Sequence, residues 1–104
     1  MENAYYINNY PTMRASFGVE ATPPTVPPTY TPTDPVTLTA TTIDPTGVQI
    51  PYLFPATGLV KESVANYALR FKLTRVGPWI VRWNATFPDG TSSETDQPVY
   101  CLVN

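Results

Sequence analysis

Two runs of alternating apolar and polar residues constrain this chain more than any other feature. In residues 67–74, tyrosine, leucine and phenylalanine alternate with alanine, arginine, lysine and threonine. In residues 79–87, tryptophan, valine, alanine and phenylalanine alternate with isoleucine, arginine, asparagine and threonine. Side chains on a β-strand point to opposite faces in turn, so each run predicts a strand with one apolar face. Gly77-Pro78 separates the runs, and we expect two neighbouring antiparallel strands.

Earlier segments carry the same signal more weakly. Residues 13–17 alternate and end at Gly18, which predicts a first core strand. Residues 36–43 alternate strictly, and Asp44-Pro45-Thr46-Gly47 then predicts a tight turn. The returning strand, residues 48–54, contains Pro51, which restricts it to an edge or a bulge because proline lacks a backbone donor.

The remaining strand candidates complete an all-β prediction. Residues 59–64 are compatible with a strand or a helical turn, and we expect a strand. Pro88-Asp89-Gly90 forms a turn, residues 91–95 suit an exposed strand start, and residues 98–103 suit the final strand. Six or seven short strands without a long helix predict an immunoglobulin-like antiparallel β-sandwich.

The apolar positions of these runs define the expected core. Tryptophans dominate the burial energy of a small domain, and truncating one to alanine costs on the order of 3–5 kcal/mol. The predicted core comprises Leu38, Tyr67, Leu69, Phe71, Leu73, Trp79, Val81 and Trp83.

Length and proline content predict the domain organisation. A chain of 104 residues suits one domain, which we place at residues 11–104, with residues 1–10 as an extended N-terminal arm. Residues 22–35 hold six prolines among threonines, a composition typical of extended backbone. A ligand for a groove-binding domain has similar composition, but we favour a connector between strands.

Charge argues against a nucleic-acid partner. The net charge is −2, and the six cationic residues are dispersed. Four of them lie between residues 70 and 82, where they would form a small positive patch if the two strands were adjacent. Phosphate binding needs a denser basic surface. Charged residues are only 13% of the chain, which suits packing against other subunits, although Thr, Asn, Ser and Gln could equally provide solubility.

No residue pattern predicts catalysis, a metal or a cofactor. Histidine is absent, which excludes Ser-His and Cys-His arrangements. The single cysteine, Cys101, lies in an apolar run and suits a buried, inert thiol. Asp34, Asp44 and Asp89 each adjoin a proline, a pattern typical of turns. We therefore expect a chain that is not an enzyme.

The sequence also gives an expectation for localisation. The N-terminus lacks the basic and apolar regions of a signal peptide. No apolar run approaches the roughly 20 residues that a membrane helix requires. We expect a chain that is synthesised in the cytoplasm and does not associate with a membrane.

The order of these features resembles a known family. The first alternating run, Gly77-x-Trp79-x-Val81-Arg82-Trp83, the Pro88-Asp89-Gly90 turn and a closing Tyr/Val strand are similar to the small immunoglobulin-like β-sandwich proteins encoded among head, neck and tail genes of tailed bacteriophages. The 13–17 strand, the 36–40 strand and the 44–47 turn match in that order. The resemblance covers roughly residues 10–104. The long Pro/Thr connector and the aromatic arm depart from the pattern.

The resemblance implies a non-enzymatic structural protein of the virion, at the neck (head-tail connector) or the tail. Its partners would be other neck, tail or capsid subunits, in a homo-oligomeric ring or symmetric array. Candidate interface residues are the tyrosines of the arm and connector, Tyr5, Tyr6, Tyr10 and Tyr30. The alternatives are a capsid decoration (cement) protein, and a carbohydrate- or protein-binding module whose tyrosines stack on sugar rings.

Overall fold

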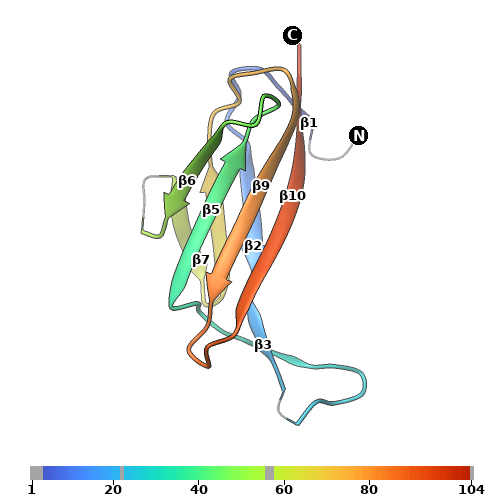
Figure 1. Ribbon diagram of the computed structural model, residues 1–104, viewed down its shortest axis with the longest axis vertical. Coiled ribbons are helices and arrows are strands. Elements are labelled where there is room, and N and C mark those ends of the chain that lie inside the picture. The colour runs from blue at the N-terminus through green and yellow to red at the C-terminus, as the bar shows by residue number, and fades with distance from the viewer. Residues whose placement is uncertain (1–3, 22, 56–57, 104) are drawn as a thin grey trace.

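The protein is all-β in the part of the chain that the computed structural model describes, residues 4–21, 23–55 and 58–103. These residues form ten strands and no helix (Figure 1). The strands are β1 (Ala4–Tyr6), β2 (Thr12–Ser16), β3 (Gly18–Glu20), β4 (Tyr30–Pro32), β5 (Thr37–Ile43), β6 (Gln49–Leu53), β7 (Leu59–Ser63), β8 (Asn66–Arg70), β9 (Gly77–Thr86) and β10 (Ser92–Leu102).

Eight of these strands form two sheets that face each other. The large sheet has five strands in the order β1-β10-β9-β5-β6, and the small sheet has three in the order β2-β8-β7. Neighbouring strands are antiparallel except β1, which runs parallel to β10. Among the described strands, β3 and β4 pair only with each other, and this hairpin projects from one end of the body (Figure 1). The architecture is sandwich-like.

The core lies between the two sheets, and all eight predicted core residues belong to it. Trp83 is fully buried, and along β9 the residues from Trp79 to Ala85 alternate between buried and more exposed positions. Phe17 packs edge-on against both Tyr67 and Trp83, with ring centroids 5.9 and 6.2 Å away. These rings come from opposite sheets, so Phe17 joins the two layers.

The two alternating runs are not neighbours in one sheet, contrary to the sequence-based expectation. β8 belongs to the small sheet and β9 to the large sheet. The chain crosses between them through residues 71–76, where Phe71 and Leu73 stay buried beyond the end of β8. In opposite sheets the apolar faces of β8 and β9 cover each other across the core, whereas the neighbouring strands β9 and β10 turn their inner faces the same way.

The structure gives parts of the N-terminal arm and of the connector definite strand positions. Ala4–Tyr6 is an edge strand of the large sheet, with Tyr5 beside Cys101, and the Asn8 amide donates to the Leu73 carbonyl at 2.8 Å. Residues 1–3 of the predicted arm lie outside the described residues. The connector contributes Tyr30–Pro32 to the hairpin, and its residue 22 also lies outside.

The predicted hairpin around residues 44–47 is present. One carboxylate oxygen of Asp44 accepts hydrogen bonds from the Thr46 and Val48 amides at 2.8 and 2.9 Å. Gly47 has φ of +91°, a left-handed conformation that glycine adopts without strain. The returning strand β6 is the terminal strand of its sheet, as Pro51 predicted.

Candidate interaction site

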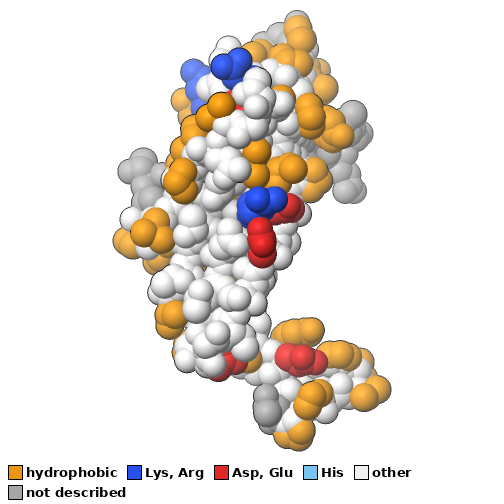
Figure 2. Space-filling model, in the orientation of Figure 1, with side chains coloured by type: hydrophobic (Ala, Val, Ile, Leu, Met, Phe, Trp, Pro, Cys, Tyr) orange, Lys and Arg blue, Asp and Glu red, His pale blue; other side chains and the backbone are white. Residues whose placement is uncertain are grey.

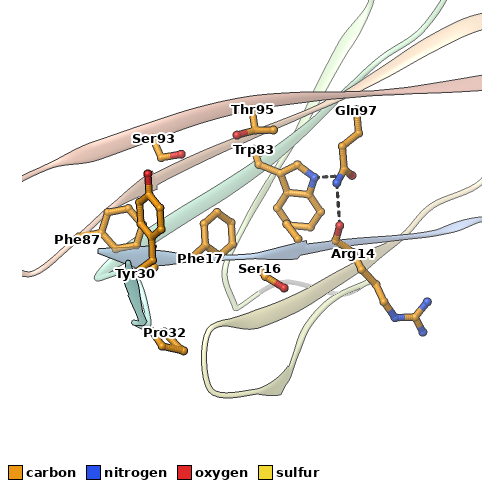
Figure 3. Close-up of a pocket in the computed structure, with 12 residues that line it drawn as sticks. Arg14, Ser16, Phe17, Tyr30, Pro32, Trp83, Phe87, Ser93, Thr95 and Gln97 are labelled. Carbon is orange, nitrogen blue, oxygen red and sulfur yellow. Dashed lines mark hydrogen bonds between the residues drawn. The ribbon is translucent and has the colours of Figure 1, made fainter. Parts of the chain in front are cut away.

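A groove opens where β2 and β10 face each other across the gap between the sheets (Figure 3). Its volume is about 500 Å³, within the range typical of ligand pockets. The residues that line it come from both sheets and from the base of the hairpin: Arg14, Ala15, Ser16, Phe17, Gly18, Tyr30, Pro32, Trp83, Phe87, Ser93, Thr95 and Gln97.

Aromatic rings form the floor of this groove. Phe17 lies between Trp83 and Phe87, with ring centroids 6.2 and 6.3 Å away. Tyr30, which is 64% exposed, lies at the hairpin end of the groove (Figure 3). Phe17, Trp83 and Phe87 are themselves buried, so the groove lies directly above the core. Of the residues that line it, Arg14 alone is charged.

Gln97 ties the two sheets together across the groove. The Trp83 indole N–H donates to Gln97 Oε1 at 2.9 Å, and Gln97 Nε2 donates to the Arg14 carbonyl at 2.8 Å (Figure 3). Both ends of one amide are thus used, which satisfies a buried indole donor and holds β10 near β2.

Both strands that flank the groove have a free edge. β10 pairs with β9 along its length, but among the described residues its other edge is covered only at Tyr100–Leu102, by β1. In the described part of the chain, β2 pairs with β8 on one side alone. Edge strands of this kind expose backbone donors and acceptors that can pair with another chain.

An ion cluster lies on the outer face of the large sheet beside this edge. Arg82 Nε is 3.0 Å from Glu94 Oε1 and 2.9 Å from Asp96 Oδ1. The hydrogen bond from Arg82 lowers the pKa of Asp96 below its ordinary value. One guanidinium faces two carboxylates, so the cluster keeps an excess negative charge next to the open edge.

Three of the four cationic residues between 70 and 82 have an acidic or aromatic partner. Arg82 is engaged in the ion cluster. Arg75 lies 3.4 Å from Asp44, and the Arg70 guanidinium lies 5.2 Å from the centroid of the Tyr10 ring. Arg70 belongs to β8 and Arg82 to β9, so these two side chains come from different sheets.

The four candidate interface tyrosines do not form one surface. Tyr5 is partly buried and packs against the core, because its position in β1 pairs with Cys101 on the inner side of the sheet. Tyr6 and Tyr10 are half exposed. Tyr30 belongs to the hairpin at the opposite end of the body (Figure 1), and of the four it alone lines the groove.

Asp34 links two segments of the fold through hydrogen bonds. Its carboxylate accepts from Lys61 Nζ at 2.7 Å, the Ala65 amide at 2.8 Å and the Tyr67 hydroxyl at 3.1 Å. The Lys61 and Ala65 hydrogen bonds lower the pKa of Asp34. Burial, with Asp34 nearby, raises the pKa of Tyr67 to about 12. Asp34 thus fastens the segment after the hairpin to the β7–β8 turn, whereas Asp44 and Asp89 bond their own turns.

The other chemically distinctive residues are dispersed in the described ranges. No group of three or more His, Cys, Asp or Glu side chains lies close enough there to hold a metal ion. The Cys101 thiol is in the core, where burial raises its pKa. No helix of the described chain has the length and apolarity to cross a membrane.

Comparison of the chain with family models, curated proteins and solved structures gave no match.

The sequence did not reveal the groove. Phe87 belongs to the second alternating run and Phe17 to the first strand, but neither was singled out as part of a site. Gln97 lies in a polar stretch and gave no signal, because its role depends on Trp83 and Arg14, which lie far from it in the sequence.

Proposed function

We propose that this chain is a non-enzymatic structural subunit of a tailed-phage particle, located at the neck or the tail, which assembles through the groove side of its body. The observation that carries the proposal is the open-edged aromatic groove beside a projecting hairpin. A free strand edge beside a groove that lies directly above the core provides backbone groups that binding another chain would cover.

The proposal includes an immunoglobulin-like topology, and the strand order supports it. Immunoglobulin sheets have the orders B-E-D and G-F-C, with C′ added in variable-type domains. Here β2-β8-β7 corresponds to B-E-D, and β10-β9-β5-β6 corresponds to G-F-C-C′. The Trp79 indole donates to the Arg75 carbonyl four residues upstream at 2.8 Å, at the start of β9, the place where a tyrosine corner occurs in these folds.

The hairpin supports an assembly role. Every residue from Pro23 to Pro32 is exposed, and Val26 is completely so. Prolines fix their own backbone angles, so such a segment loses little conformational entropy when it docks. A hairpin that extends beyond the body is suited to reach a neighbouring subunit in a ring or symmetric array.

The outer face of the large sheet adds a second apolar surface. Four of its apolar side chains are exposed, those of Tyr6, Ile80, Tyr100 and Leu102. Figure 2 shows hydrophobic side chains gathered at the end of the body opposite the hairpin. Aromatic residues are enriched at protein interfaces, and charged residues are depleted from interface cores. The groove side and this apolar outer surface together suit a subunit with more than one neighbour.

Mass spectrometry and cryo-electron microscopy of purified particles test this function. We expect the chain in the particle, in a symmetric arrangement at the neck or the tail. Density on the capsid surface would instead identify a decoration protein. Absence of the chain from the particle, together with glycan binding by the isolated protein, would replace the proposal with a carbohydrate-binding module.

A further inference from the structure

We infer that the groove accepts an extended strand from a different polypeptide, which pairs with the free edge of β10 at Ser92–Asp96. The inference rests on the proposed function, since it specifies how the groove side binds a partner. The partner's chemistry is a strand of alternating apolar and polar residues with at least one lysine or arginine on its outer face.

The backbone of β10 provides the first argument. Ser92–Asp96 pairs with β9 on one side, and in the described structure no strand covers its other side. A strand added there would pair with main-chain groups that are otherwise left to water. About five residues at 3.3 Å each would cover this stretch.

The groove provides the second argument. Thr95 lies opposite Trp83 in the β9–β10 register, so the inner face of an added strand would point toward Phe17, Trp83 and Phe87. Alternate side chains of the added strand would enter the space of about 500 Å³ above these rings. The Gln97 bridge to Arg14 bounds this space along β10.

The fold already contains one strand added along this edge. β1 pairs in parallel with Tyr100–Leu102 of β10, and it places Tyr5 against the core. The proposed strand would occupy the remainder of the same edge and bury its inner side chains in the same manner. The pairing of β1 with Tyr100–Leu102 therefore shows how a strand can be added at Ser92–Asp96.

Charge determines which strand fits. Outward side chains of the added strand would lie beside Glu94 and Asp96, which share the single Arg82. A basic residue there would balance the excess negative charge. Pairing of β10 with β10 of a second copy would instead bring four carboxylates together, and like charges on adjacent strands are destabilising.

The test uses the purified full chain and a nine-residue capped peptide in which valine alternates with lysine and threonine. We expect saturable shifts of the Ser92–Asp96 amides and the Trp83 indole in ¹⁵N NMR titrations. A peptide of the same composition with its valines grouped, one with glutamate for lysine, and one with alternate amides N-methylated should each bind at least about tenfold more weakly.

Paired protein variants locate the site. Thr95→Arg places a long charged side chain in the groove and should weaken binding about tenfold or more, whereas Thr37→Arg, on the outer face of β5, should change it less than about twofold. Ser93→Arg replaces Thr95→Arg if the latter spectrum shows unfolding. No binding at millimolar peptide, equal binding of the grouped peptide, or shifts elsewhere would overturn the inference.

A second copy as the occupant would also overturn it. In that case the Ser92–Asp96 shifts would change with protein concentration, and sedimentation would show a dimer without peptide. These outcomes are separate from the proposed function, because the chain can be present in particles whether or not this edge binds a strand. Conversely, absence from particles would leave a positive peptide titration intact.

Discussion

The body and the hairpin are both built from extended, paired backbone, but only the body has an interior. In β9 every second residue from Trp79 to Ala85 is buried, whereas every residue from Pro23 to Pro32 is exposed. The hairpin is held by local bonds, such as Ala21 N–H to the Thr29 carbonyl at 2.9 Å. Strand pairing therefore gives the hairpin its shape, while apolar burial stabilises the body.

The two regions meet at Asp34. The segment that leaves the hairpin is fastened to the small sheet through the Lys61, Ala65 and Tyr67 donors of this one carboxylate. Thr33 N–H also donates to the Phe17 carbonyl at 3.3 Å, at the base of the hairpin. Changes in the body, at the junction and in the hairpin should therefore differ in their cost to stability.

The largest effect is expected in the body. Trp83→Ala should lower the free energy of unfolding by about 3–5 kcal/mol, because it leaves a cavity in the core and removes the partner of Gln97. Tyr30→Ala in the hairpin is the matched aromatic control, with an expected change within about 0.5 kcal/mol. Urea denaturation followed by circular dichroism measures both. Equal losses would contradict the division between body and hairpin.

The junction should show an intermediate effect with a pH dependence. The pKa of Asp34 is lowered in the folded state, so its contribution is present above the unfolded value near 3.8 and is lost as the pH falls through the folded pKa. Asp34→Asn should lower the free energy of unfolding at pH 7 and reduce its fall between pH 7 and pH 2. Urea midpoints measured from pH 7 down to pH 2 test it. If the loss of stability at low pH were the same in Asp34→Asn, the hydrogen bonds of Asp34 would not stabilise the fold.

Tyr67 should show a smaller effect, at the alkaline end. Its pKa is raised from 10.0 to about 12, so the contribution of its protonated hydroxyl is complete below pH 10 and is lost as the pH rises through the folded value. Tyr67→Phe should cost about 1 kcal/mol at pH 7 and remove the alkaline dependence. Titration of phenolate absorbance against pH measures the ionisation of tyrosine in the wild type and in Tyr67→Phe, with Tyr52→Phe as the control. Ionisation of Tyr67 near pH 10 would contradict the buried hydrogen bond.

The smallest effect is expected at the tip of the hairpin. Replacing residues 23–28 with Asn-Gly should change the free energy of unfolding by less than about 0.5 kcal/mol, because these side chains are exposed and loop length contributes weakly. Under the proposed function the same variant should be incorporated poorly into particles. Thermal unfolding and particle composition measure the two outcomes. Destabilisation comparable to Trp83→Ala would mean that the hairpin packs as part of the body.

The sequence by itself determined the all-β class, the eight core residues that it named, and the turns at residues 44–47 and 88–90, whereas Gly77-Pro78 proved to lie within β9. Alternation with period two is a local property of a strand, so it identified Leu38, Leu69 and Trp83 as core without any knowledge of their partners. Turn chemistry is local as well, which is why the Asp44 turn and the edge position of the Pro51 strand were predictable.

Only the tertiary structure decided which strands pair and what they enclose. The alternation of β8 and β9 is equally compatible with one sheet or two, and the structure places the strands in opposite sheets. The parallel pairing of β1, and the groove between Phe17, Trp83 and Phe87, depend on contacts between residues far apart in the chain. Periodicity specifies which face of a strand turns inward, but pairing and packing specify where that strand lies.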